Sequence, residues 1–151
     1  MKIYIGADHR GYNFKDLIKK ILLAQGHQVV DVGTDTAQVS CDYPKIAYKV
    51  ATQVARHKNS RGMLLCMSGM GQAIAANKIR GAYAALCHNI QGAKLSRQHN
   101  NSNILVMGSK FVKAKEVPRI VKTWLTTAFE GGRHQRRFNQ IRKLEQGKKL
   151  T

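Results

Sequence analysis

Short apolar runs alternate with amphipathic stripes along most of the chain. The runs have the length of buried strands, and we expect five strands, at residues 2–5, 28–32, 63–66, 83–87 and 103–107. Between them, apolar residues recur every three or four positions, which is typical of helices that bury one face. We expect helices at residues 14–25, 42–56, 73–76, 90–97 and 116–127, and a last helix from 133 to about 146.

Glycine, proline and aspartate mark several of the predicted boundaries. Gly26 follows the first helical stripe in the position of a C-terminal stop, and Gly131-Gly132 interrupts the chain before the last helix. Asp42 is available to cap the second helix, with Pro44 in its first turn. Alternating strands and helices predict a parallel, doubly wound sheet with right-handed crossovers. A chain of 151 residues fits a single domain, residues 1–151.

One stretch combines a strand, a glycine turn and a helix. The apolar run 63–66 ends at Cys66, Gly69 and Gly71 mark a tight turn, and the helix-forming residues 73–76 follow. A helix entered in this way directs unpaired backbone N–H groups into the turn, where phosphates and oxyanions bind. Because this positive field favours thiolate over thiol, Cys66 is a candidate base or nucleophile near neutral pH. The alternative is an inert, buried cysteine.

A second candidate group follows the first strand. Asp8 and His9 stand at its carboxyl end, the edge that carries the site in open α/β sheets. The surrounding loop, residues 6–11, lacks the Lys-Ser/Thr of a nucleotide P-loop and the three glycines of a dinucleotide fingerprint. The alternatives are an acid at a helix N-terminus for Asp8 and a solvent-facing loop residue for His9.

The chain is strongly basic, with a formal net charge of +18. Such a charge raises the question of nucleic-acid binding, but lysine and arginine are spread over most of the sequence and only residues 133–149 form a dense run. No aromatic-rich RNA motif, zinc-finger spacing or leucine heptad accompanies that run. We therefore interpret the charge as solvated surface with at most nonspecific affinity for nucleic acid.

Composition and cysteine usage indicate a cytoplasmic protein that does not bind membranes. Hydrophobic residues make up 43% of the chain, no apolar run approaches the length of a membrane span, and the first residues resemble a strand rather than a signal peptide. The three cysteines, Cys41, Cys66 and Cys87, are odd in number and lack metal-type spacing. We expect no structural disulfide and no metal site.

With these segments in place, the sequence resembles the type B ribose-5-phosphate isomerase family, which includes the subunits of galactose-6-phosphate isomerase. The resemblance runs almost end to end, and its landmarks occur in order: GADHRG at 6–11, DYP at 42–44, Cys66 with the glycine turn, AANK at 75–78, SRQHN at 96–100 and EGGRH at 130–134. It implies an α/β protein with a three-layer α/β/α Rossmann-like fold and a five-stranded parallel sheet. It also implies a homodimer or homotetramer in which the helix from about 133 packs on a neighbouring subunit.

The activity implied by the resemblance is cofactor-free aldose–ketose isomerisation of a sugar phosphate. Interconversion of ribose 5-phosphate and ribulose 5-phosphate moves a proton between C1 and C2 through an enediolate. Cys66 matches the family's base, His99 its ring-opening acid/base, and Asp8 a supporting position that we include among the catalytic residues. The N–H groups of the glycine turn match its anion hole: Met67, Ser68, Gly69, Met70 and Gly71. Other sugar- or phosphate-contacting positions are matched by His9, Tyr43, Asn100, Lys110, Arg133, His134 and Arg137.

One departure concerns Met67, because the family usually has a small residue after the catalytic cysteine. If that position requires a positive φ, methionine is strained there, and its side chain would crowd the sugar. Besides a ribose-5-phosphate isomerase, we therefore consider two alternatives. One is a hexose-6-phosphate isomerase subunit acting on galactose or allose, and the other is a non-catalytic protein that binds sugar phosphate or nucleic acid. The presence of Cys66, His99 and Asp8 together argues against the non-catalytic alternative.

Overall fold

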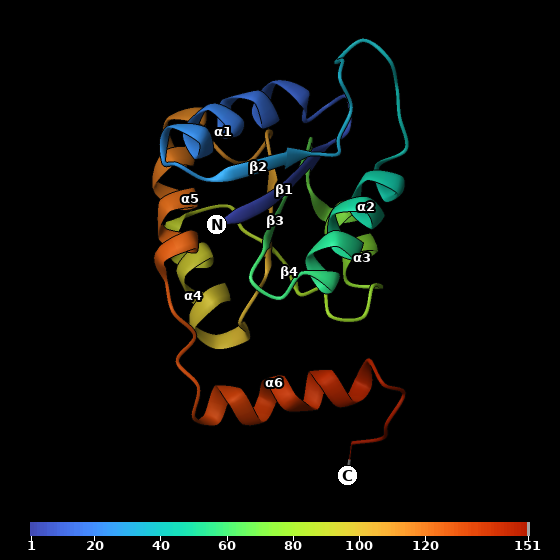
Figure 1. Ribbon diagram of the computed structural model, residues 1–151, viewed down its shortest axis with the longest axis vertical. Coiled ribbons are helices and arrows are strands. Elements are labelled where there is room, and N and C mark those ends of the chain that lie inside the picture. Colours follow the sequence, from blue (N-terminus) through green and yellow to red (C-terminus); the bar gives the residue numbers. More distant parts are fainter. Residues whose placement is uncertain (151) are drawn as a thin grey trace.

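A five-stranded parallel sheet forms the centre of the molecule (Figure 1). The computed structural model describes residues 1–150. The strands are β1 (Lys2–Ala7), β2 (Gln28–Asp31), β3 (Arg61–Cys66), β4 (Ala84–Leu86) and β5 (Ile104–Gly108). They lie in the order β2-β1-β3-β5-β4, and each neighbouring pair is parallel. The predicted five-stranded parallel sheet is therefore confirmed.

Helices cover both faces of this sheet. They are α1 (Tyr12–Ala24), α2 (Tyr43–Arg56), α3 (Met70–Ala76), α4 (Ile90–Asn100), α5 (Val117–Thr126) and α6 (Arg133–Leu144), with a 3₁₀ turn, η1 (Ala114–Glu116), before α5. One face packs against α1, α4 and α5, and the other against α2 and α3 (Figure 1). These layers confirm the three-layer α/β/α arrangement.

Two apolar layers form the core because the central strands bury both of their faces. Ile3 and Ile5 pack with α1 and α5, whereas Tyr4, between them, packs with α2. Successive strand residues point to opposite faces, so an uninterrupted apolar run is what a strand covered on both sides requires. Trp124 of α5 is fully buried, and its indole N–H donates to Ser102 Oγ at 2.9 Å.

Three of the predicted helix boundaries are informative. Gly26 has φ +77° and terminates α1, as expected. Asp42 precedes α2, but its side chain makes no capping hydrogen bond; its carboxylate pairs instead with Lys45 Nζ at 3.2 Å, so the predicted capping role is wrong. Helix α4 continues past Arg97 to Asn100 and stops at Asn101, which has a φ of +48°. Within residues 1–150, Asn101 is the only residue other than glycine with a positive φ.

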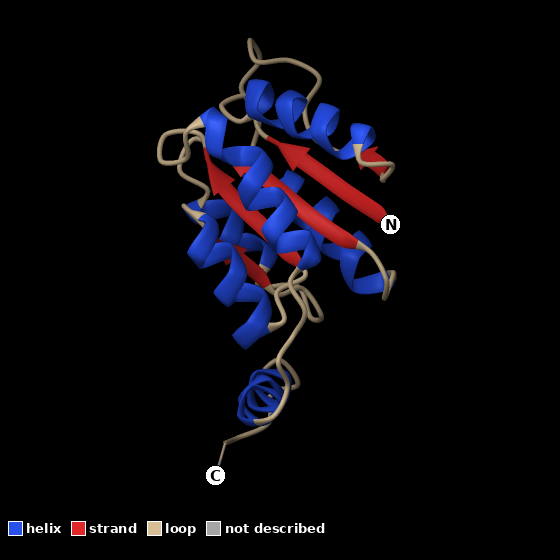
Figure 2. Ribbon diagram, turned by 90° about the vertical axis from the view of Figure 1, so that its left-hand side faces the viewer, coloured by secondary structure: helices blue, strands red, loops and turns tan. Residues whose placement is uncertain are grey.

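The last helix stands apart from the body of the molecule (Figures 1 and 2). Gly131 and Gly132, with φ of +68° and +52°, form the predicted break before α6. Phe138 packs edge-on against Tyr83 with ring centroids 4.6 Å apart. Glu145 accepts hydrogen bonds from Tyr83 Oη at 2.9 Å and from the Gly81 N–H at 3.1 Å. Residues 1–150 contain no helix that is both long and apolar enough to cross a bilayer.

Candidate functional site

The point where the strand order reverses brings Asp8 beside Cys66. β1 lies between β2 and β3, so the chain winds outward in both directions from it. Ala7 and Leu65 are register partners, and the residues that follow them are Asp8 and Cys66. Helices α1 and α2 leave this edge on opposite faces of the sheet. Open α/β sheets bind their ligands at such a switch point, outside the carboxyl ends of the strands.

A hydrogen bond joins the two side chains. Cys66 Sγ donates to Asp8 Oδ2 at 2.8 Å, while the other carboxylate oxygen accepts from the Gly11 N–H at 2.9 Å. Asp8 is buried and Cys66 is half-buried. Burial, followed by the hydrogen bond and charge of Asp8, raises the pKa of the Cys66 thiol. The expected thiolate is therefore wrong for this resting arrangement, because an adjacent carboxylate disfavours a second negative charge.

The backbone around this pair is closely packed. A Cβ at Gly11 would lie 2.3 Å from the Leu65 carbonyl oxygen, and one at Gly108 would lie 2.4 Å from that of Ser68. Glycine at these positions lets the loop after β1 and the end of β5 approach β3 and its turn. The Asp8–Cys66 pair is thus held by main chain on both sides.

The glycine turn, residues 67–71, follows Cys66 directly. The backbone N–H groups of Gly69 and Met67 partly counter the rise in the pKa of Cys66. Gly69 has φ +81°, whereas Met67 does not have a positive φ, so the strain considered for methionine does not arise. The Met67 side chain is 43% exposed. A Cβ on Gly71 would lie 2.5 Å from the Tyr43 ring, which shows how closely α2 approaches the turn.

Two further predicted residues reach the same edge. His9 Nδ1 accepts from the Cys41 N–H at 3.3 Å, which ties the loop before α2 to the end of β1. Lys110 donates its backbone N–H to the Met67 carbonyl at 3.0 Å and exposes its side chain. We call this set the carboxyl-edge group: Asp8, His9, Tyr43, Cys66, residues 67–71 and Lys110.

The remaining predicted residues lie at the opposite edge of the sheet. Helix α4 begins after β4 and returns toward the amino ends of the strands, where the Asn103 carbonyl accepts from the Gly62 N–H. His99 and Asn100 occupy its last turn. Along a strand, the distance from one edge of the sheet to the other is about 13 Å. One chain therefore does not bring His99 to Cys66. We call this set the amino-edge group: His99, Asn100, Glu130, Arg133, His134 and Arg137.

Two stacked imidazoles and a carboxylate lie at the centre of the amino-edge group. The rings of His99 and His134 are parallel within 5°, with centroids 4.1 Å apart. Glu130 Oε2 is 3.5 Å from His134 Nε2 and 3.9 Å from His99 Nε2. Desolvation first, and then the neighbouring His99 and Arg133 side chains, lower the pKa of His134. Glu130 was not predicted as a site residue, although its position four residues before His134 was visible in the sequence.

Of the two arginines of this group, Arg133 contacts its neighbour, since its Nε donates to His134 Nε2 at 3.5 Å. Arg133 and Arg137 are exposed, one turn apart at the start of α6, and neither forms an ion pair with any residue of the described chain. The predicted placement of both at the start of a helix is confirmed.

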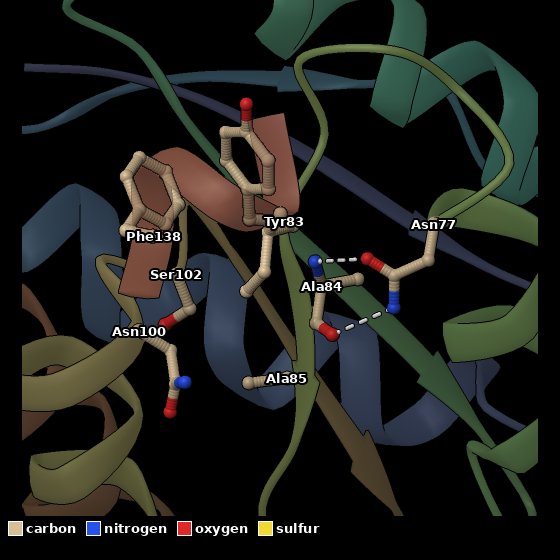
Figure 3. Close-up of a pocket in the computed structure, with 8 residues that line it drawn as sticks. Asn77, Tyr83, Ala84, Ala85, Asn100, Ser102 and Phe138 are labelled. Atoms are coloured by element: carbon tan, nitrogen blue, oxygen red, sulfur yellow. Dashed lines mark hydrogen bonds between the residues drawn. The ribbon is translucent and has the colours of Figure 1, made fainter. Parts of the chain in front are cut away.

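A cavity of about 290 Å³ adjoins the amino-edge group (Figure 3). It lies between β4, the end of α4 and α6, and its lining includes Asn100, Tyr83 and Phe138. Asn77 bounds it on the side of β4, where its amide bonds both the N–H and the carbonyl of Ala84, at 2.8 and 2.9 Å. This amide replaces a neighbouring strand at the edge of the sheet.

Comparisons with known proteins agree with this arrangement. The model of the ribose/galactose isomerase family matches residues 3–141. The ribose-5-phosphate isomerase B of Escherichia coli is 42% identical over 145 residues, which cover 96% of this chain and 97% of that protein. Many curated relatives of similar length match as well.

Solved structures match over the same length. The ribose-5-phosphate isomerase B of Clostridium thermocellum superimposes with a TM-score of 0.94 at 44% identity, over 97% of this chain and 99% of that one. That of Mycoplasma genitalium, solved with bound ribulose 5-phosphate, gives 0.92 at 40% identity, over 96% of each chain. The chain therefore belongs to the ribose/galactose isomerase family and is a sugar-phosphate isomerase.

Proposed function

We propose that this isomerase interconverts ribose 5-phosphate and ribulose 5-phosphate through an enediolate, at a site built from two copies of the chain. The observation that carries the proposal is the Cys66–Asp8 hydrogen bond at the switch point of the sheet. The similar proteins are ribose-5-phosphate isomerases, which supports a pentose as the substrate. Nothing at the site favours a hexose over a pentose, so the assay must include both.

The proton transfer starts from a neutral thiol. Cys66 passes its proton to Asp8 along the existing 2.8 Å hydrogen bond, and the resulting thiolate removes the proton from C2 of the open-chain aldose. The thiol then returns this proton to C1 while the proton of the C2 hydroxyl passes to O1, which gives the ketose. Asp8 finally returns its proton to the sulfur, which restores the resting pair. N–H groups from Gly69 and Met67 stabilise the sulfur while it is charged. The Gly71 N–H, in the first turn of α3, is left for the enediolate oxygen, whereas the Met70 N–H donates to Ser68 Oγ at 3.4 Å.

The ring-opening and phosphate-binding residues come from the second copy. Within one chain, His99, Arg133 and Arg137 lie at the far edge of the sheet from Cys66. Exposed apolar side chains beside the carboxyl-edge group support a covered surface there, since Tyr43, Met70 and Ile74 are 41%, 51% and 63% exposed. Docking of the amino-edge group of one copy on the carboxyl-edge group of the other would complete a site at each contact.

The test is an isomerase assay with ribose 5-phosphate and a panel of hexose 6-phosphates. Cys66→Ala should lower kcat by about 10² to 10⁴, with ligand binding retained, whereas Cys41→Ala should be active. His99→Asn should impair turnover of the cyclic sugar and largely spare an open-chain substrate. Full activity of Cys66→Ala, or equal losses of His99→Asn on both substrates, would contradict these roles.

The phosphate-binding role of α6 has its own matched pair of variants. Arg137 lies one turn from Arg133 at the start of the helix, and Arg142 lies near its end. Arginine presents a planar fork of donors to phosphate oxygens. Arg137→Ala should raise KM for the sugar phosphate at least about tenfold, the worth of one charge-assisted hydrogen bond, and Arg142→Ala should leave it nearly unchanged. Equal effects would show that α6 contributes only general positive charge.

A further inference from the structure

We infer that His99, Glu130 and His134 form a binding site for a divalent transition-metal ion, represented by Zn²⁺, and that its occupation switches the isomerase off. The three side chains offer donor atoms that all lie within 4.8 Å of one another. The binding half of this inference rests on geometry alone. The inhibitory half rests on the proposed role of His99 in ring opening.

The donor set is one that zinc uses. Two imidazole nitrogens and one carboxylate oxygen leave a fourth position open in tetrahedral zinc sites. With metal–ligand bonds of about 2.1 Å, neighbouring donor atoms in a tetrahedron lie about 3.4 Å apart. Glu130 Oε2 is already 3.5 Å from His134 Nε2 and 3.9 Å from His99 Nε2. Both carboxylate–nitrogen distances are therefore close to the spacing that a shared ion requires.

The main rearrangement falls on His99. Parallel rings cannot both direct an in-plane lone pair at one ion, so the 4.1 Å stack must open. His134 is buried, but the His99 side chain is 37% exposed and the Glu130 side chain 46% exposed. His99 can therefore turn while His134 stays in place.

The backbone that carries Glu130 is fixed to the helix that carries His99. The Glu130 N–H donates to the Gln98 carbonyl at 3.0 Å, and Arg97 Nε donates to the Thr127 carbonyl at 3.3 Å. Arg97 itself is buried. These bonds hold two of the three donors in one unit before any ion arrives, which lowers the entropic cost of binding.

The neighbouring charges decide which metal ion the cluster would take. Arg133 Nε donates to His134 Nε2 at 3.5 Å, and this long hydrogen bond must open before the nitrogen can bind an ion. Arg133 and Arg137 oppose a dication, whereas the Glu130 carboxylate compensates part of its charge. An ion that binds nitrogen strongly, such as Zn²⁺ or Co²⁺, is therefore favoured over Mg²⁺ or Ca²⁺.

Metal binding would remove the group that opens the sugar ring. An Nε2 lone pair held by an ion cannot accept or return a proton. Occupied protein should therefore lose turnover of cyclic ribose 5-phosphate, regain it when a chelator is added, and retain more activity on an open-chain substrate.

The experiment is a titration of the metal-free full chain with CoCl₂, followed by visible absorption, and then competition with ZnCl₂. We expect visible bands of four- or five-coordinate cobalt that EDTA removes. Glu130→Gln and His134→Asn should each weaken Co²⁺ binding at least about tenfold, the usual consequence of losing a ligand or its support. Glu116→Gln, which changes an acid of η1 outside the cluster, is the matched control, and Cys66→Ser excludes binding through the thiol.

Each outcome decides one half of the inference. Unchanged Co²⁺ affinity in Glu130→Gln, or loss of the bands in Cys66→Ser, overturns the metal site whatever the enzyme does. Binding that depends on Glu130 and His134, combined with undiminished turnover of cyclic sugar at saturating Zn²⁺, overturns the switch, whereas the ring-opening role of His99 stands or falls with the His99→Asn assay. Cobalt binding that depends on both residues, with turnover lost and restored by EDTA, supports both halves.

Discussion

At the scale of single residues, the proposed chemistry depends on the proton of the Cys66 thiol. Its pKa is raised by burial first and by Asp8 second, and the two N–H groups of the glycine turn counter only part of this rise. The arrangement protects the thiol in the absence of substrate, because the thiolate is the reactive form. Reactivity is thus available only when the carboxylate can accept the proton.

Replacing that carboxylate should make the thiol more reactive and the enzyme less active. In Asp8→Asn the neighbouring negative charge is gone, so the pKa of Cys66 should fall and its alkylation by iodoacetamide near neutral pH should accelerate by about three- to tenfold. Peptide mass spectrometry follows Cys66 and Cys41 separately, with Cys41 as the internal control. Slower or unchanged alkylation of Cys66 would show that Asp8 does not restrain the thiol.

A second residue-scale feature is the side chain of Gln72. It is fully buried in α3, and neither its nitrogen nor its oxygen has a hydrogen-bond partner within residues 1–150. An unpartnered buried amide costs about 1–3 kcal/mol. Gln72→Met keeps an unbranched side chain of similar length.

Gln72→Met should therefore raise the free energy of unfolding by about 1–3 kcal/mol, measured by urea denaturation. Gln91→Met, at an exposed position of α4, should change it by less than about 0.5 kcal/mol. A destabilised Gln72→Met would mean that the amide has a partner in solution, such as a buried water molecule.

At the scale of elements, apolar periodicity located every strand to within a few residues because the central strands are buried on both faces. Apolar periodicity did not predict where a helix ends when polar residues continue that helix. Gln98, His99 and Asn100 carry no apolar stripe, so α4 was predicted to end at Arg97, whereas its stop is Asn101 with a positive φ. The capping role of Asp42 failed for a related reason, because composition does not reveal that Lys45 takes the carboxylate.

Helix α6 is attached to the rest of the molecule through its contacts with Tyr83. Burial and the Glu145 carboxylate raise the pKa of Tyr83 to about 12. Because the folded state favours the neutral phenol, this contact contributes its stabilisation below the ordinary tyrosine pKa of about 10 and loses it as the pH rises toward 12.

Glu145→Gln should bring the Tyr83 titration to lower pH, seen as earlier phenolate absorbance among the tyrosines in an ultraviolet pH titration. Glu116→Gln, whose carboxylate lies on η1, should leave that titration unchanged. An unaltered curve in Glu145→Gln would mean that burial alone raises the Tyr83 pKa and that Glu145 does not hold α6.

At the scale of the whole molecule, one chain brings together only part of the predicted site. Asp8 and Cys66 follow strands, and the carboxyl ends of parallel strands share an edge, so their proximity was predictable. His99 lies in the last turn of a helix, and a helix that connects parallel strands returns to the other edge. The charge state of Cys66 was not predictable, because it depends on the orientation of the Asp8 carboxylate at 2.8 Å.

The separation of Cys66 and His99 within one chain can be tested by combining two inactive variants. If Cys66 of one copy works with His99 of the other, a mixed dimer of Cys66→Ala and His99→Asn chains contains one intact site and one that lacks both groups. Random pairing of equal amounts makes about half of the dimers mixed, so subunit exchange should restore about a quarter of the wild-type activity. The measurement is the isomerase rate before and after exchange, with sedimentation to establish that dimers are present.

Each variant mixed with itself is the control and should gain nothing. If the mixture also gains nothing while exchange is demonstrated, Cys66 and His99 do not combine across the subunit contact, and the two edges of the sheet serve separate purposes.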